Sequence, residues 1–324
     1  MDKIRVGIVG YGNLGRGVEL SIDENEDIQL VGVFTRRDPT FIETKAKAFS
    51  IDDIKDFKNE IDVMILCGGS AKDLPKQGPE LSTMYNTVDS YDNHSKIPSY
   101  FSEMNEAAKN SNKVSIISVG WDPGLFSLNR LLYESILPQG KNYTFWGDGI
   151  SQGHSDAIRR VKGVKRGVQY TRPIQETLNK VRQGKNPELT NSDRHKRICY
   201  IVPEESANLD KIKKNIKTMP NYFEDYDTEV YFISEEEFVN NHNKMPHGGF
   251  VIHTANTGNN HKQRMEFSLT LESNPEFTSS VLVAYARAAY KLSQEGKAGA
   301  YTVFDIPFSY LSPKSGESLR ERLL

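Results

Sequence analysis

The sequence predicts an α/β protein with two domains, the first built on a doubly wound parallel sheet and the second, of α+β type, on an open mixed sheet. Three observations support this prediction. Short apolar, β-branched runs alternate with helical patterns through about the first 120 residues, as in parallel sheets covered by helices. A glycine-rich turn directly follows the first of these runs. After residue 120 the strand-like runs become longer.

The first 37 residues have the order strand, glycine turn, helix, strand. The run at residues 3–9 leads into a G-x-G-x-x-G turn at residues 10–15, and a second run ends at residue 34. This order is typical of a Rossmann-like dinucleotide-binding unit. We expect Gly10 to allow the tight turn, Gly12 to let backbone amides approach a pyrophosphate, and Gly15 to bring the helix close to the strand.

The second strand ends in two arginines rather than an acid. An NAD site carries Asp or Glu here for the ribose 2′-hydroxyl, whereas this chain has Thr35, Arg36 and Arg37. Because guanidinium groups match a phosphate, the sequence predicts NADP as the cofactor. The alternative is a glycine turn in an unrelated α/β protein, with both arginines merely solvated. The predicted cofactor contacts are Gly10, Tyr11, Gly12, Asn13, Leu14, Gly15, Thr35, Arg36, Arg37, Cys67, Gly68, Gly69, Ser70 and Ala71.

Three further apolar runs predict the remaining strands of the first sheet, at residues 61–67, 86–89 and 114–119, and residues 97–110 have helical character. Ligands bind beyond the carboxyl ends of parallel strands. The polar segments that follow these strands, residues 67–70, 89–94 and 120–124, are therefore site candidates.

The second half of the chain predicts an α+β domain. Helical patterns occur at residues 125–137, 174–182 and 208–217, and strand-like runs at residues 143–146, 164–170, 194–202, 229–233, 250–256 and 264–271. A helical apolar stripe at residues 277–292 is expected to pack back onto the first domain. The predicted domains are residues 1–120 plus about 276–324 for the dinucleotide, and residues 121–275 for substrate binding and dimerisation.

Composition excludes several classes of function. The 324 residues are 37% hydrophobic and 26% charged, with a net charge of −2, which is typical of a soluble globular protein and gives no basic surface for nucleic acid. No apolar run approaches the length of a membrane span. The first strand begins too early for a signal peptide, and Cys67 and Cys199 form no disulfide framework or metal motif. We expect a cytoplasmic protein without a metal.

Two aspartates are the candidate catalytic residues. Asp92 and Asp122 follow neighbouring strands of the predicted sheet, so their carboxylates are expected to converge near the nicotinamide. Two acids suit a cationic amine, and oxidation of an amine requires a free nitrogen lone pair. A carboxylate that binds the ammonium and takes its proton meets both needs. For Asp122 a turn or helix-cap role ahead of residue 125 is an equal alternative.

The second domain contains further polar candidates, each with a structural alternative. Residues 147–156 include three glycines whose amides suit a carboxylate, or they form a flexible surface loop. Arg197 suits a bidentate carboxylate contact, or it is an exposed charge on a strand. His247 lies between turn-forming residues, and a zinc site with His242 lacks a third ligand. Asn274 precedes Pro275, where a turn or cap is the alternative role.

Taken together, these motifs closely resemble one family, meso-diaminopimelate dehydrogenase, an NADP-dependent enzyme family of lysine biosynthesis. The matching segments are residues 4–19, 34–37, 88–98, 120–130, 144–160, 167–171, 195–200, 218–223, 245–252, 274–278 and 298–307. They extend in order over nearly the whole chain. The resemblance implies reversible oxidative deamination of the D centre of meso-2,6-diaminopimelate to L-2-amino-6-oxopimelate, ammonia and NADPH by a homodimer.

The resemblance also implies roles for individual residues. Asp92 and Asp122 would bind the amino group at the D centre, and one of them would relay its proton. The substrate-binding residues would be Trp121, Trp146, Gln152, Gly153, Thr171, Arg197, His247 and Asn274. Of these, Trp146, Gln152 and Gly153 would bind the D end, and Thr171, Arg197, His247 and Asn274 the carboxylate of the L end.

One position departs from the family pattern, because Gly68 stands where a methionine is expected, and a contact with the cofactor edge is lost. Two other readings of the sequence stay open. The chain could be a different NADP oxidoreductase of similar architecture, such as a dihydrodipicolinate reductase or another amino-acid dehydrogenase. It could also be a non-catalytic NADP sensor, although Asp92, Asp122 and Arg197 together argue against that reading.

Overall fold

The computed structural model describes residues 3–324, which form two compact units. One unit ends at Leu128 and resumes with Pro275–Leu324, and the other comprises Asn129–Asn274. The first boundary therefore lies within helix α4 (Leu125–Ile136), eight residues beyond the one predicted.

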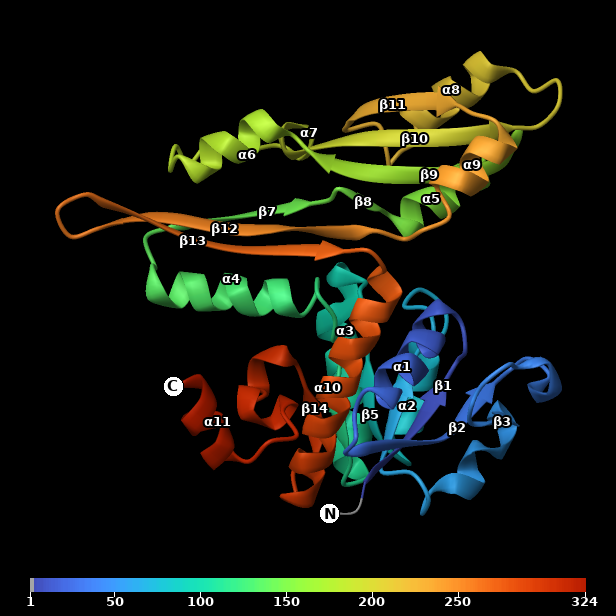
Figure 1. Ribbon diagram of the computed structural model, residues 1–324, viewed down its shortest axis with the longest axis vertical. Coiled ribbons are helices and arrows are strands. Elements are labelled where there is room, and N and C mark those ends of the chain that lie inside the picture. Colours follow the sequence, from blue (N-terminus) through green and yellow to red (C-terminus); the bar gives the residue numbers. More distant parts are fainter. Residues whose placement is uncertain (1–2) are drawn as a thin grey trace. The chain divides into compact units, whose positions relative to one another are not determined.

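The first unit contains a seven-stranded sheet within residues 3–324, and every neighbouring pair in it is parallel. Its order is β14-β6-β5-β4-β1-β2-β3 (Figure 1). The strands are β1 (Ile4–Val9), β2 (Ile28–Thr35), β3 (Lys47–Ser50), β4 (Val63–Leu66), β5 (Asn86–Asp89), β6 (Val114–Ile116) and β14 (Gly299–Tyr301). Strand order reverses between β1 and β4, which is where doubly wound sheets bind ligands.

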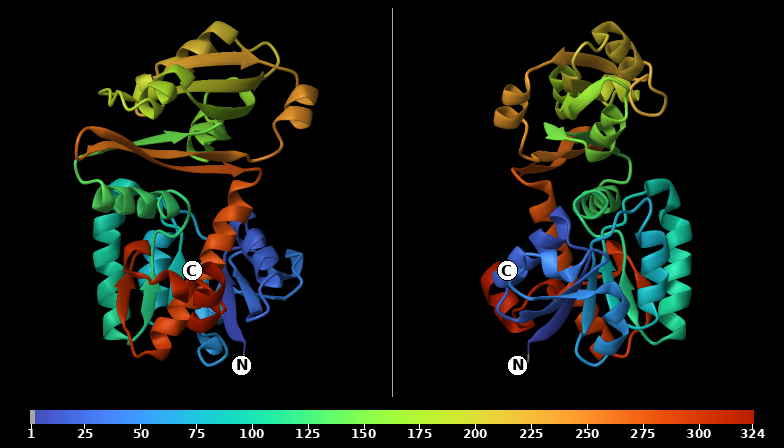
Figure 2. Two further views of the ribbon diagram at one scale, coloured as in Figure 1. Left: turned by 60° about the vertical axis from the view of Figure 1, so that its left-hand side comes forward. Right: turned by 90° about the vertical axis from the view of Figure 1, so that its right-hand side faces the viewer.

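Helices cover both faces of this sheet (Figure 2). On one face, α1 (Asn13–Asp23) and α10 (Asn274–Gln294) pack through a core that includes Val18 and Leu282. On the other face, α2 (Leu74–Ser82) and α3 (Ile97–Asn110) pack through Leu81 and Met104. The stripe predicted for the last long helix thus lies in the core of the first unit. The shorter elements here are η1 (Pro39–Phe41), η2 (Ile51–Phe57), η3 (His94–Lys96), η4 (Val303–Asp305), η5 (Phe308–Leu311) and α11 (Gly316–Leu323).

The second unit contains a mixed sheet in the order β11-β10-β9-β8 and an antiparallel sheet in the order β13-β12-β7. The strands are β7 (Lys141–Trp146), β8 (Gly149–Ile150), β9 (Val164–Pro173), β10 (His195–Pro203), β11 (Asp227–Phe232), β12 (His247–Thr257) and β13 (His261–Leu271). The helices are α5 (Gln152–Arg159), α6 (Gln175–Arg182), α7 (Asn191–Arg194), α8 (Leu209–Lys217) and α9 (Glu235–Asn241). Residues Ile212 and Ile216 of α8 bury against Cys199 and Ile201 of β10.

The predicted fold class is confirmed. Strands β3 and β14 were not predicted, and two of the predicted segments differ from prediction. The strand expected at residues 114–119 ends at Ile116, because Ser118 has a positive φ of 57°, which strands do not accommodate. The glycine-rich segment at residues 147–156 is not an irregular loop throughout, since it contains β8 and the start of α5. Within residues 3–324, none of the helices is both long and apolar enough to span a membrane.

Candidate active site

The glycine turn between β1 and α1 has the shape of a phosphate-binding loop. Gly10 has a φ of 90°, which favours glycine. A Cβ on Gly15 would lie 2.2 Å from the carbonyl oxygen of Gly10, so glycine is needed for the helix to start this close to the strand. A Cβ on Gly12, by contrast, would meet no atom within 4 Å. Open space in front of the first amides of α1 fits a pyrophosphate.

Two predicted cofactor contacts have side chains that point into the fold. The buried Tyr11 donates its hydroxyl hydrogen to the carboxylate of Glu19, which also accepts from Thr44 at 2.5 Å. Burial alone would raise the pKa of Glu19, but these hydrogen bonds outweigh it and lower the pKa. Thr35 is buried, and its Oγ1 accepts from the amide of Arg37 at 3.1 Å. Tyr11 therefore shapes the turn through its side chain, whereas the Thr35 hydroxyl accepts a hydrogen bond within the turn and keeps its own hydrogen as a donor.

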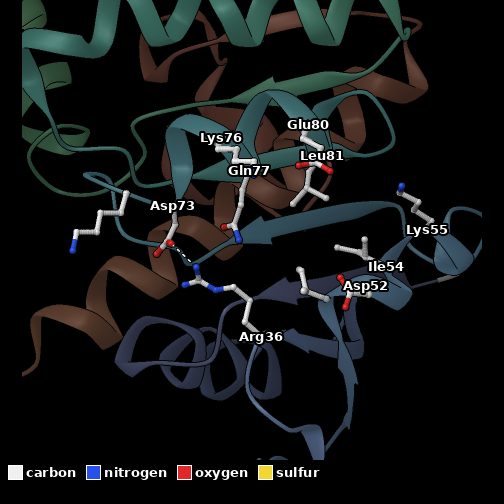
Figure 3. A pocket seen from close by; sticks show the side chains of 11 residues that line it. Arg36, Asp52, Ile54, Lys55, Asp73, Lys76, Gln77, Glu80 and Leu81 are labelled. Atoms are coloured by element: carbon white, nitrogen blue, oxygen red, sulfur yellow. Dashed lines mark ion pairs between the residues drawn. The ribbon is translucent and has the colours of Figure 1, made fainter.

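The two arginines lie beside the glycine turn. The guanidinium of Arg37 donates to the carbonyl oxygen of Tyr11 at 2.5 Å. Arg36 forms an ion pair with Asp73 at 3.0 Å, and its side chain is 66% exposed (Figure 3). A cavity of about 360 Å³ lies beside Arg36, between η2 and α2. Two cations held at the end of β2 fit a 2′-phosphate.

The segment after β4 is connected to both the arginines and the first candidate acid. The amide of Gly69 donates to Oδ2 of Asp73 at 3.0 Å, and Oδ1 of Asp73 binds Arg36. A Cβ on Gly68 would lie 2.8 Å from the Cβ of Asp73, so a side chain at this position would displace the partner of Arg36. Ser70 accepts from the amide of Asp92 at 3.1 Å. Burial raises the pKa of Cys67, which keeps this thiol protonated.

The two candidate acids follow neighbouring strands, as predicted. Asp92 is exposed and comes three residues after β5, and Asp122 is half-buried and follows β6. Helix α4 begins at Leu125, three residues after Asp122. Trp121 is buried and packs edge-on against Phe126, with ring centroids 5.2 Å apart.

In the second unit, a row of paired residues crosses the mixed sheet. Thr171 on β9 lies opposite Gly149 on β8 and Arg197 on β10, so their side-chain positions share one face. Arg197 is 7% exposed and donates to the hydroxyl of Thr171. Its guanidinium lies 4.0 Å from the ring centroid of Tyr226. Within residues 3–324 its Nε has no hydrogen-bond partner. The alternative of an exposed strand charge is therefore wrong for Arg197.

Two histidines stand near this arginine in uncharged form. Burial and the Arg197 charge lower the pKa of His195 to about 3 and the pKa of His154 to about 4. His195 accepts at Nε2 from the amide of Trp146 at 2.8 Å, and the two rings stack with centroids 5.3 Å apart. His195 and His154 therefore add no positive charge to the surroundings of Arg197 at neutral pH.

The remaining predicted substrate residues lie on elements other than β9 and β10. Gln152 and Gly153 are the first two residues of α5, an eight-residue helix whose N-cap Ser151 makes no side-chain cap. Their amides are thus presented by a helix N-terminus, not by a flexible loop. His247 packs on the backbone of Gly149, where a Cβ would lie 2.5 Å from the Cα of His247. Asn274 is the first residue of α10 and donates its amide to the carbonyl of Met245 at 3.0 Å.

Several residues of this cluster were not predicted. Gln169 and His195 lie two positions before Thr171 and Arg197 on their strands, so strand alternation was a signal that could have found them. Tyr226 lies outside the strands, and no local pattern indicated it.

His242, the second histidine of the zinc alternative, stacks on Tyr200 with ring centroids 4.3 Å apart. Within the described residues no three His, Cys, Asp or Glu side chains form a candidate metal site.

Comparison with known proteins identifies the family. A model described as "Diaminopimelic acid dehydrogenase C-terminal domain" matches residues 120–273. A meso-diaminopimelate D-dehydrogenase of Ureibacillus thermosphaericus is 64% identical over 326 residues, covering 100% of both chains. This chain belongs to the meso-diaminopimelate D-dehydrogenase family. The predicted family is thus confirmed.

Two solved structures extend this result. A substituted meso-diaminopimelate dehydrogenase of Clostridium tetani E88 with diaminopimelate is 58% identical, with a TM-score of 0.95 over 99% of this chain and 100% of that chain. An engineered D-amino acid dehydrogenase bound to NADP⁺ is 43% identical, with a TM-score of 0.88 over 99% of this chain and 100% of that chain. The family fold therefore extends over essentially the whole chain.

Proposed function

We propose that this protein catalyses the reversible, NADP-dependent oxidative deamination of the D centre of meso-2,6-diaminopimelate, which gives L-2-amino-6-oxopimelate and ammonia. Membership of the family supports the reaction. The observation that carries the substrate class is Arg197, a buried cation that has no carboxylate partner among residues 3–324 and lies beside Thr171. Burial of an unpaired cation is costly, and a substrate carboxylate would offset that cost.

The residues around the glycine turn fit NADP. We assign the pyrophosphate to the backbone of Gly10 to Gly15 and the 2′-phosphate to Arg36 and Arg37, with the segment from Cys67 to Ala71 along its edge. When bound, NADP supplies the oxidised nicotinamide that accepts a hydride. The NADP⁺ of the engineered D-amino acid dehydrogenase supports this assignment.

We assign the substrate's D-centre amino group to Asp92 and Asp122. Their carboxylates would bind the ammonium and orient it, and one of them would take its proton so that the nitrogen lone pair becomes free. Trp121, which is buried beside Asp122, would line this end of the site. After the hydride has left the D centre, water would attack the imine carbon of the substrate and ammonia would leave. In the reverse direction the same acid would return the proton to the amine.

The carboxylates are assigned to the second unit. The amides of Gln152 and Gly153 would bind the carboxylate of the D end, next to the indole of Trp146. Thr171, Arg197, His247 and Asn274 would bind the carboxylate of the L end. Anchoring both ends makes the reaction stereoselective, because a meso compound has the same groups at each end and differs only in handedness.

The Clostridium tetani structure supports this assignment. In that protein the printed substitutions replace, in chain order, a glutamine, a threonine, an arginine, an adjacent proline and histidine, and an asparagine. The same residue types occur here in the same order as Gln152, Thr171, Arg197, Pro246, His247 and Asn274. A homodimeric state and a cytoplasmic location stay predictions.

The test measures NADPH formation by the purified protein, in separate assays with the meso, D,D and L,L isomers of diaminopimelate. We expect turnover with meso-diaminopimelate and NADP, little with NAD, and none with the L,L-isomer, which lacks a D centre. Consumption of NADPH with dihydrodipicolinate, without turnover of diaminopimelate, would favour the reductase alternative. Binding of NADP without turnover of any isomer would favour the sensor and refute the proposed reaction.

A further inference from the structure

Asp89 is a buried acid at the carboxyl end of β5 for which the proposed reaction has no direct use. Its side chain is fully buried. Oδ1 accepts from the backbone amides of Tyr91 at 2.9 Å and Ser118 at 3.1 Å, and Oδ2 accepts from the hydroxyl of Tyr100 at 2.8 Å. Its backbone carbonyl accepts from the amide of Val119 at 2.9 Å. One residue therefore receives four hydrogen bonds: one comes from α3, and three come from two loop segments, which follow β5 and β6.

These two segments are the ones that carry the candidate acids. Tyr91 immediately precedes Asp92, and Ser118 and Val119 precede the turn that contains Asp122. The hydrogen bonds to Oδ1 therefore join the backbones of both segments at a single atom. Displacing either segment would break at least one of these bonds, so Asp89 couples the position of Asp92 to that of Asp122.

The surroundings of Asp89 show that this connection is built at a cost. Ser118 is held at a φ of 57°, which non-glycine residues rarely adopt. Burial raises the pKa of Asp89 to about 6, and a carboxyl group buried without a cation is unfavourable for folding. The Tyr100 ring that donates to Asp89 also stacks on Tyr91, with centroids 4.1 Å apart. Such costs are typical of functional sites, where geometry takes precedence over stability.

We propose that Asp89 is a positioning residue, which fixes the two substrate-binding aspartates, Asp92 and Asp122, relative to each other through Tyr91 and Ser118. The inference rests on the proposed function, because it assigns the substrate amine to those two acids. The hydrogen bonds, not the charge, do the positioning. An amide at this position can still accept from both backbone amides and donate to the oxygen of Tyr100.

The test compares two substitutions of Asp89 in the full-length protein. Asp89→Leu removes all side-chain acceptors, and we expect kcat/KM for meso-diaminopimelate to fall about 100-fold or more, as for a misplaced catalytic group, with an increased KM for this substrate. Asp89→Asn keeps the acceptors and should restore most of the activity. The dissociation constant of NADPH, measured by fluorescence titration, should change far less than the KM for diaminopimelate in both variants, because the glycine turn and the arginine pair follow β1 and β2.

Thr87→Val is the matched control. Thr87 is buried on the same strand and donates to Ser115 of β6 at 2.9 Å, so its loss removes a β5–β6 hydrogen bond without touching either acid-bearing segment. We expect its kinetic constants to match those of the wild type. If the role of Asp89 were purely structural, Asp89→Leu would lower the fraction of active protein and hence kcat, and KM would stay unchanged.

Three results would overturn the positioning role: wild-type kinetics in Asp89→Leu, an equal loss in Asp89→Asn, or a lower kcat with unchanged KM for diaminopimelate. Loss of NADPH binding in Asp89→Leu would also overturn it, since the damage would then extend to the fold. Absence of turnover in the wild-type protein is a separate outcome, which refutes the proposed function itself.

Discussion

Replacement of Arg197 by methionine should affect substrate binding and protein stability differently. Methionine fills much of the volume of the arginine side chain but removes its donors and its charge. Arg197 is buried against Thr171 and the ring of Tyr226, so it is already oriented before a carboxylate arrives. The proposed contact with the L-end carboxylate comprises two charge-assisted hydrogen bonds.

The expected loss of activity follows from these two bonds. At about 1.5–3 kcal/mol each they contribute about 3–6 kcal/mol, which corresponds to about a 10²- to 10⁴-fold lower kcat/KM for meso-diaminopimelate. Most of the loss should appear in KM, because the carboxylate is bound in the ground state as well as the transition state. The stability of the ligand-free protein should not fall, since the substitution removes a buried cation without a carboxylate partner among residues 3–324.

The assays are steady-state kinetics at saturating NADP and thermal unfolding without ligands. We expect Arg197→Met to have a Tm equal to or above that of the wild type. Lys196→Met is the matched control, because Lys196 is the adjacent residue on β10 and forms an exposed ion pair with Asp227 at 3.0 Å. Its kinetics should match the wild type. A KM for Arg197→Met close to that of the control would refute the assignment of Arg197 to the substrate carboxylate.

Three further predictions concern the cofactor turn and the neutral histidines. The double substitution Arg36→Ala and Arg37→Ala should weaken NADP by about 10²- to 10⁴-fold and NAD little in fluorescence titrations; equal losses would show that the pair does not bind the 2′-phosphate. Gly12→Ala should weaken both cofactors at unchanged Tm, because its Cβ meets open space, whereas Gly15→Ala should lower the Tm through the clash with Gly10; similar melting temperatures would contradict this pairing. Because the pKa of His195 is lowered to about 3 in the folded state, the unfolded chain takes up the proton first, and folding free energy is lost as pH falls below about 6.5, by about 2 kcal/mol at pH 5. Denaturant unfolding of His195→Gln should show a smaller loss over this range, and an unchanged pH profile would exclude His195 as the source.

Local patterns predicted the central strands of the first unit but not its edge strands β3 and β14. The apolar runs that became β1, β2 and β4, and the spacing of Gly10 and Gly15, can each be recognised within a short stretch of sequence. The direction of a parallel strand then determines at which edge its following residues lie. For this reason the placement of Asp92 and Asp122 after neighbouring strands was predictable before their surroundings were known.

By itself, the sequence determined the α/β class, the dinucleotide turn, the arginine pair and, through resemblance, the family. Only the tertiary structure decided that Arg197 is buried beside Thr171, that Gln152 and Gly153 begin a helix, and that Asp89 joins the two acid-bearing segments. The physical reason is that burial and cross-strand pairing depend on residues far apart in the chain. A local pattern cannot distinguish an arginine facing solvent from one facing a site, because the neighbours that make the difference come from other strands.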